Sequence, residues 1–109
     1  MDYSKLSDFE INSAVSMALL DKSANPSARY VAIGDYCNNP ADAWPILLEN
    51  HIAVVPYRHT LPQAWPTAFG MASKFMTEHA NPLRAGMIVF LMMQESANVP
   101  ANSTGSDIR

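Results

Sequence analysis

The most apolar stretch of the chain, residues 87–93, reads Met-Ile-Val-Phe-Leu-Met-Met. A run of this length fits a strand as well as a helix, so its flanks must decide. Asn81 can cap a helix, Pro82 suits the first helical position, where no N–H donor is needed, and Gln94 and Glu95 prolong the segment. A helix that is apolar on most sides is buried. We therefore predict a central helix that begins at Pro82.

The same stretch predicts a protein environment rather than a membrane. A transmembrane helix needs about 20 apolar residues, whereas this run is bounded by Arg84 and Glu95. Gly86 costs a helix about 1 kcal/mol relative to alanine, which suggests that another backbone, from this chain or from a second subunit, packs against it. We expect the methionines of this run to fill the core, with a methionine-rich interface as the alternative.

Length and composition indicate one domain. The chain has 109 residues, of which 49% are hydrophobic, and this is close to the commonest domain size. We assign residues 1–97 to the domain and residues 98–109, which are mostly small and polar, to a disordered tail. Residues 1–5 are charged rather than apolar, so we expect no secretory signal and a cytoplasmic location.

The charge pattern argues against nucleic acid as the partner. The formal net charge is −3, and no two of the seven Lys and Arg residues are adjacent, whereas a phosphate-binding surface needs clustered positive charge. A local basic patch built from distant residues remains the alternative, and its members would be Arg29, Arg58, Lys74 and Arg84.

Two further helices are predicted from capping signals. Ser7 and Glu10 form a capping box, which predicts a helix over residues 8–20. Asn39 can cap a second helix that begins at Pro40. Because Pro45 cannot donate in a helix, residues 40–43 either form a single turn, after which Asp42 caps a new helix, or continue. We expect Asn50 to end this segment in the left-handed conformation.

The predicted strands are residues 29–33, followed by a turn at Gly34-Asp35, and residues 52–55, which Pro56 ends. Residues 57–69 hold two prolines and are not expected to keep regular structure, and residues 71–79 are predicted as a short helix. The fold class is therefore α+β: a small antiparallel or mixed sheet, packed on one side by the N-terminal helix and the buried apolar C-terminal helix. The strand order stays open.

Catalytic and metal-binding signatures are weak. The histidines at positions 51, 59 and 79 show neither ligand spacing nor a zinc motif. Cys37, the single cysteine, excludes an internal disulfide and is read as a small core residue, with a nucleophile as the alternative. Asp35 and Asp42 could serve acid–base chemistry, but a helix cap explains Asp42 more simply. We predict no enzyme, no metal and no cofactor.

Two aromatic loops are the candidate protein-binding segments, residues 36–44 and residues 57–65. Tryptophan and tyrosine are common anchors of binding surfaces, although a buried tryptophan is as common. We favour the core for Trp44 and leave Trp65 open between core and surface. The candidate binding residues are Tyr36, Asn38, Asn39, Trp44, Tyr57 and Trp65.

Three stretches together resemble the NinX family of small phage and prophage proteins: residues 1–12 (MDYSKLSDFEIN), 35–46 (DYCNNPADAWPI) and 81–94 (NPLRAGMIVFLMMQ). Residues 13–33 and 55–80 show no such likeness. The family has no assigned biochemical activity, so the resemblance implies no catalytic or ligand residues. It implies an accessory protein in the infected bacterial cell, encoded near genes of recombination and late transcription.

The leading hypothesis from the sequence is a non-enzymatic protein that binds a phage or host protein. A homodimer that uses the 87–93 helix or a sheet edge is the second hypothesis. A nucleic-acid-associated factor and a small enzyme with a site near Cys37 are the remaining alternatives.

Overall fold

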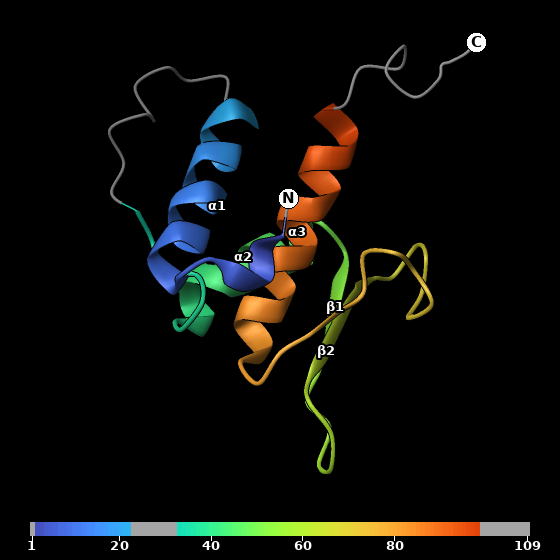
Figure 1. The fold of residues 1–109 in the computed structure, drawn as a ribbon. Helices are drawn as coiled ribbons and strands as arrows, with labels where there is room; N and C mark the ends of the chain where they lie inside the picture. Colours follow the sequence, from blue (N-terminus) through green and yellow to red (C-terminus); the bar gives the residue numbers. More distant parts are fainter. Residues whose placement is uncertain (1, 23–32, 99–109) are drawn as a thin grey trace, which may run out of the picture.

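A computed structural model describes residues 2–22 and 33–98 of the chain. The fold class is confirmed as α+β, with helices against one side of a small antiparallel sheet (Figure 1). In chain order the elements are η1 (Tyr3–Lys5), α1 (Asp8–Lys22), α2 (Pro40–Glu49), β1 (Ile52–Val55), β2 (Gln63–Pro66), β3 (Thr77–Glu78) and α3 (Pro82–Asn98). Among the described residues, no helix is both long and apolar enough to cross a membrane.

Helix α3 is the centre of the fold, as its apolar run predicted. It contacts α1, α2 and all three strands, and Figure 1 shows it between α1 and the sheet. Asn81 caps it, because its Oδ1 accepts hydrogen bonds from the N–H groups of Leu83 (3.0 Å) and Arg84 (3.3 Å). Residues 84–91 are all buried. Met87 lies in the core, and Met92 and Met93 pack against it.

Gly86 is needed for close packing, but not against a backbone. A Cβ at this position would lie 2.7 Å from Cδ2 of Leu47 and 3.1 Å from Cγ2 of Val54. The neighbours are thus side chains of α2 and β1 in the same chain. The expectation that another backbone packs against Gly86 was wrong. Helix α3 lies against α2 and β1 at this point, and branched side chains of those two elements fill the space beside Gly86.

Helix α1 begins as predicted and packs on α3. The Ser7 N–H donates to the Glu10 carboxylate (2.8 Å), and the Glu10 N–H donates to the Ser7 hydroxyl (3.1 Å), which completes the capping box. Ile11 and Val15, one turn apart, are fully buried. Because α3 lies between α1 and the strands (Figure 1), the two helices form successive layers over the sheet.

Helix α2 runs unbroken from Pro40 to Glu49, which decides between the two alternatives: the chain continues through Pro45 and does not restart at Asp42. Asn39 is the N-cap, and its Oδ1 accepts the Ala41 N–H at 3.0 Å. Pro45 lies inside the helix on an exposed side, where solvent can satisfy the carbonyl that its missing N–H leaves unpaired. The Asp42 carboxylate instead accepts the N–H of Asp35 at 3.1 Å.

The end of α2 also differs from the prediction. Asn50 has φ −100°, and the left-handed residue is His51, with φ 54°. Histidine is one of the few non-glycine residues enriched in that region. Asn50 still ends the helix, because its side-chain amide donates to the Ile46 carbonyl at 2.8 Å.

The sheet has the order β1-β2-β3, with both pairs antiparallel. Strand β1 is confirmed, whereas β2 forms within residues predicted as irregular and β3 replaces the predicted helix over 71–79. Prolines did not exclude β2, because Pro66 is its last residue and Pro62 precedes its first. The predicted strand 29–33 falls on residues outside the described part, except Ile33, which lies in no strand. The predicted tail also lies outside it, except Asn98, the last residue of α3.

Candidate functional site

Trp44 and Leu48 form an exposed apolar ridge on α2. They are four residues apart and therefore lie on the same face of the helix, and their exposed fractions are 57% and 55%. The preference for Trp44 in the core was wrong. Ala43, Ile46 and Leu47 take the buried positions of α2, and Trp44 and Leu48 lie on the adjoining side, which faces solvent.

This ridge borders a shallow hollow of about 160 Å³ where β1 begins and β2 ends. Its floor includes the buried residues Leu47 and Ile52, and the exposed residues His51 and Thr67 stand at its rim. The two rim residues are joined, because the carbonyl of His51 accepts the Thr67 N–H at 2.9 Å. We call these six residues the Trp44 surface: Trp44, Leu47, Leu48, His51, Ile52 and Thr67.

The Trp44 surface combines one large exposed aromatic side chain with mainly apolar neighbours. An exposed tryptophan beside an apolar depression offers a large area that is desolvated on contact, and such anchors dominate binding energies. Of these six residues, only Trp44 was a candidate from the sequence. The fourth-residue spacing of Trp44 and Leu48 was the available signal for the ridge, whereas the contribution of Thr67 follows only from the pairing of β1 with β2.

The other candidates of the first loop serve internal contacts. The Tyr36 hydroxyl lies 3.4 Å from the Ser16 hydroxyl, and Asn39 caps α2. The Asn38 amide donates to carboxylate oxygens of Asp8 and Asp35, both at 3.2 Å. These bonds tie the loop between α1 and α2 to the start of α1, so the loop is a structural connection rather than part of the Trp44 surface.

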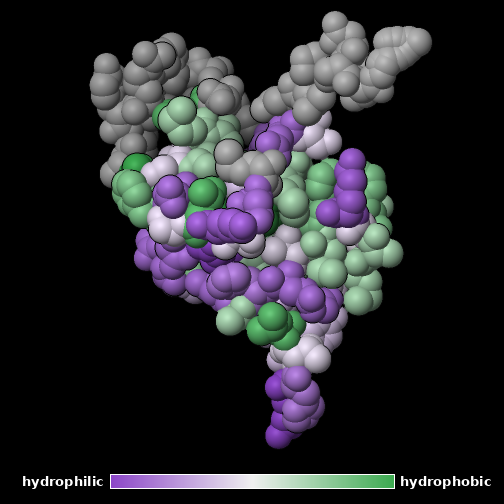
Figure 2. Space-filling model, viewed as in Figure 1, coloured by the Kyte–Doolittle hydropathy of each residue, from purple (hydrophilic) through white to green (hydrophobic). Residues whose placement is uncertain are grey.

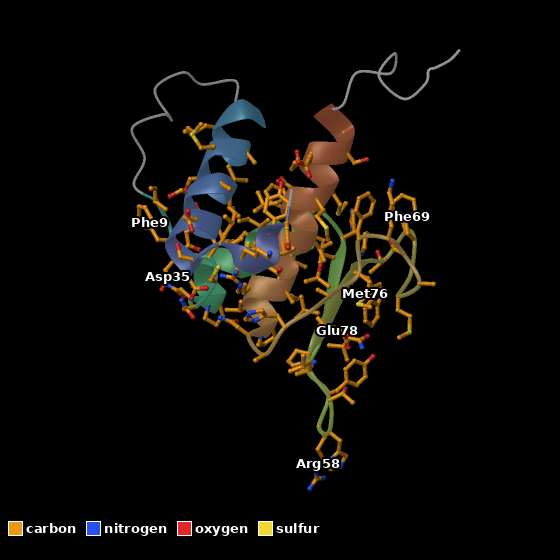
Figure 3. All side chains as sticks on the ribbon, in the orientation of Figure 1. Phe9, Asp35, Arg58, Phe69, Met76 and Glu78 are labelled. Carbon is orange, nitrogen blue, oxygen red and sulfur yellow. The ribbon has the colours of Figure 1, made fainter. Side chains whose placement is uncertain are left out.

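The candidates of the second loop lie apart from each other. Trp65 is half-buried in β2, opposite Ala53 of β1. Tyr57 is exposed in the hairpin between β1 and β2, together with Leu61. Figure 3 shows Arg58 at the tip of this hairpin, pointing away from the body of the molecule. Sequence reasoning grouped Tyr57 with Trp65, but the hairpin separates them.

A second exposed apolar area follows β2. Phe69 and Met71 are 63% and 54% exposed, and Figure 2 shows a broad hydrophobic area on the side of the molecule where Figure 3 places Phe69. The Phe69 ring lies 6.0 Å from that of Phe75, which packs against the core. Phe69 and Met71 were not among the residues that the sequence pattern indicated as candidate binding residues.

A buried arginine, which the sequence suggested only as a member of a basic patch, is the main polar feature of the described core. Arg84 is 4% exposed. Its Nη1 donates to the Asp8 carboxylate at 2.8 Å, and its Nη2 donates to the carbonyls of Tyr3 (3.2 Å) and Leu6. Arg84 therefore fixes the N-terminal segment on α3 and cannot join the basic patch considered above.

Cys37 has the properties of a core thiol. It is fully buried, and its N–H donates to Oδ1 of Asn12 at 3.1 Å. Burial, and next the negative charge of Asp8, raise the pKa of Cys37 to about 11. A nucleophilic cysteine needs the opposite shift. Among the described residues, no group of three or more His, Cys, Asp or Glu side chains could hold a metal ion.

Residues 2–94 match the protein family described as "Bacteriophage P22, NinX". The chain belongs to the NinX family. The match is wider than the three stretches that carry the resemblance, because it also includes residues 13–33 and 55–80. No curated protein and no solved structure matches the chain significantly.

The three stretches that resemble the NinX family meet in space. Asn12, from the first stretch, binds the backbone of Cys37 in the second. Asn81, from the third, donates to the carbonyl of Cys37 at 2.7 Å. Arg84 then joins the third stretch to Asp8 in the first. The three stretches thus meet at a polar junction between α1, the segment just before α2, and α3.

Proposed function

We propose that this NinX-family chain is a non-enzymatic accessory protein that binds another protein, of phage or host origin, in the cytoplasm of the infected cell. The observation that carries the proposal is the Trp44 surface, where an exposed tryptophan and leucine border an apolar hollow. A patch of this kind on a small domain is typical of an interaction site.

The alternatives have less support. An enzyme with a site near Cys37 requires a thiol that reacts, whereas the raised pKa and full burial of Cys37 oppose this. Nucleic-acid binding requires converging positive charge. Arg84 is committed to internal bonds, and the net charge of the chain is −3.

Affinity capture tests the proposal. The tagged chain is incubated with nuclease-treated lysate of phage-infected host cells, beside the variants Trp44→Ser and Phe69→Ser. Phe69→Ser is the matched control, because it removes an equally exposed aromatic residue from a different surface. We expect a stoichiometric partner that the wild type and Phe69→Ser retain and that Trp44→Ser loses.

Three results would contradict the proposal. If Trp44→Ser captures the same partner as the wild type, the Trp44 surface is not the binding site, and the proposal loses the observation on which it rests. Material captured from a parallel untreated lysate, but not from the nuclease-treated one, would favour nucleic-acid binding. Turnover of a small-molecule substrate by the purified chain, abolished by one side-chain substitution, would make the protein an enzyme.

A further inference from the structure

Strand β1 has an open edge. The sheet order places β1 at one side, with β2 as its single neighbour among the described strands. Along an antiparallel ladder, hydrogen-bonded residue pairs alternate with pairs that are not hydrogen-bonded. Because the His51 carbonyl accepts the Thr67 N–H, the backbone N–H and C=O groups of residues 53 and 55 point toward β2. The N–H and C=O groups of Ile52 and Val54 therefore point to the open edge, and no residue in the described ranges outside the sheet bonds to them.

The open edge carries no charged side chain that would oppose strand pairing, although β1 has only four residues and Pro56 follows it directly. Residues 52–55 read Ile-Ala-Val-Val, without charge or proline, and natural proteins usually protect an edge with charged residues, proline or a bulge. A strand that approaches this edge would meet two backbone donors and two backbone acceptors, and no repulsive charge.

The two ends of β1 carry complementary groups. Before β1 lies the Trp44 surface, beside the exposed Glu49 at the C-terminal end of α2, where the helix dipole is negative. After β1 lies the hairpin with exposed Tyr57, Arg58 and Leu61, and Figure 1 shows that it extends beyond the helices. One end therefore offers an apolar hollow with negative charge, and the other offers apolar side chains with positive charge.

We infer that a second copy of this chain occupies the Trp44 surface, with the β1 strands of the two copies paired antiparallel about a two-fold axis. In such an interface residue i contacts residue j, and j contacts i. Antiparallel pairing reverses the direction of β1, so each hairpin lies beside the Trp44 surface of the other copy. Ile52 of each copy would pair with Val54 of the other, and these two pairs would form about four backbone hydrogen bonds. The two three-stranded sheets would then become one six-stranded sheet. The inference rests on the proposed function, because it takes the Trp44 surface as a protein-binding site and identifies the phage protein bound there as a second copy of this chain.

Disulfide trapping tests the geometry directly. A chain with Leu48→Cys is mixed with a chain with Leu61→Cys under mild oxidation, each also carrying Cys37→Ser. We expect a covalent dimer that joins the two different variants in the mixture and little product from either variant alone, because the two-fold axis separates identical positions. A Phe69→Cys chain mixed with Leu48→Cys is the control and should remain uncrosslinked.

The mass in solution tests the energetics. Light scattering from low to high micromolar concentration should show a transition from one to two chains. Trp44→Ser and Leu61→Ser should each raise the dissociation constant at least about tenfold, as expected for anchor residues, whereas Phe69→Ser should change it by less than about twofold.

Each other outcome overturns the inference. A dimer that both Trp44→Ser and Leu61→Ser leave intact uses another surface. A monomer at every concentration, without trapping, excludes the second copy. Lysate capture separates that failure from failure of the proposed function: a monomer that still binds a partner through Trp44 keeps the function, and a monomer that binds nothing loses both.

Discussion

Arg84 of α3 and Asp8 at the start of α1 form an ion pair, with 2.8 Å between Nη1 and Oδ1. The two partners differ in environment, because the arginine side chain is 5% exposed and the aspartate side chain 46%. The pair therefore joins a buried charge to one that reaches solvent. Backbone carbonyls of the N-terminal segment occupy further donors of the same guanidinium.

Replacing Arg84 should destabilise the fold strongly. Arg84→Met keeps the apolar stem but removes the guanidinium donor from the Asp8 carboxylate, which retains the bond from Asn38, and from the carbonyls of Tyr3 and Leu6. We expect a loss of about 3 kcal/mol in the free energy of unfolding, measured by urea denaturation. Lys5→Met, which removes an exposed cation, should cost less than about 0.5 kcal/mol. Equal effects of the two substitutions would refute the structural role of Arg84.

The same pair predicts a dependence of stability on pH. The hydrogen bond from Arg84, and next that from Asn38, hold the pKa of Asp8 below its ordinary 3.8. A lowered folded-state pKa means that the stabilisation is complete above the unfolded pKa and disappears as the pH falls through the folded one. Because Asp8 is half-exposed, its contribution is below about 1 kcal/mol.

The variant Asp8→Asn measures this contribution. The unfolding free energy of the wild type should exceed that of Asp8→Asn near neutral pH, and the difference should shrink below about pH 4. A difference that stays constant into strong acid would show that the charge of Asp8 does not contribute.

Alanine substitutions at Gly86 and Gly70 should each lower the free energy of unfolding, but for different physical reasons. At Gly86 the added Cβ would lie 2.7 Å from Leu47 and 3.1 Å from Val54, and overpacking costs about 1–3 kcal/mol. The better helix propensity of alanine offsets about 1 kcal/mol of this, so we expect a net loss of about 1 kcal/mol. Shortening Leu47 in Gly86→Ala/Leu47→Ala should give a loss smaller than the sum of the single losses.

Gly70 provides the comparison. It has φ 75°, and a Cβ added there would meet no neighbouring atom within 4 Å, so Gly70→Ala should cost about 1 kcal/mol through backbone strain alone. The loss at Gly70 should be additive with Leu47→Ala. Additivity at Gly86 as well would contradict the close packing of α3 on α2.

The thiol of Cys37 should be inert in the folded protein. With its pKa raised to about 11, the thiolate fraction near pH 8 is more than about 100-fold lower than for a free cysteine, and burial adds a steric block. Alkylation by iodoacetamide, followed by mass spectrometry, should become fast only in urea. Rapid labelling of the folded chain would reopen the question of a reactive cysteine.

Signals within one or two turns of the chain predicted much of this fold. The capping residues Ser7, Asn39 and Asn81 marked the starts of the three helices, because each cap depends on atoms within three residues. The apolar run 87–93 likewise predicted a buried helix, since its composition leaves no polar face.

The predictions for residues 57–79 were wrong because the strands there depend on pairing between segments and not on local signals. Strand β3 has two residues, and it exists because β2 lies beside it. Its own sequence, Thr77-Glu78, has too little pattern to indicate a strand. The prolines that suggested irregular structure lie at or just before the ends of β2, where the ladder does not need their missing donors.

The sequence by itself determined where the three α-helices begin, the strand at residues 52–55 and the burial of the central helix, because these follow from local caps and apolar patterning. Only the tertiary structure decided that Arg84 is buried, that Trp44 is exposed, and that Leu48, His51 and Thr67 surround one hollow. Burial of a single side chain depends on which elements pack against it, and those elements are separated along the chain by tens of residues, for example Asp8 and Arg84.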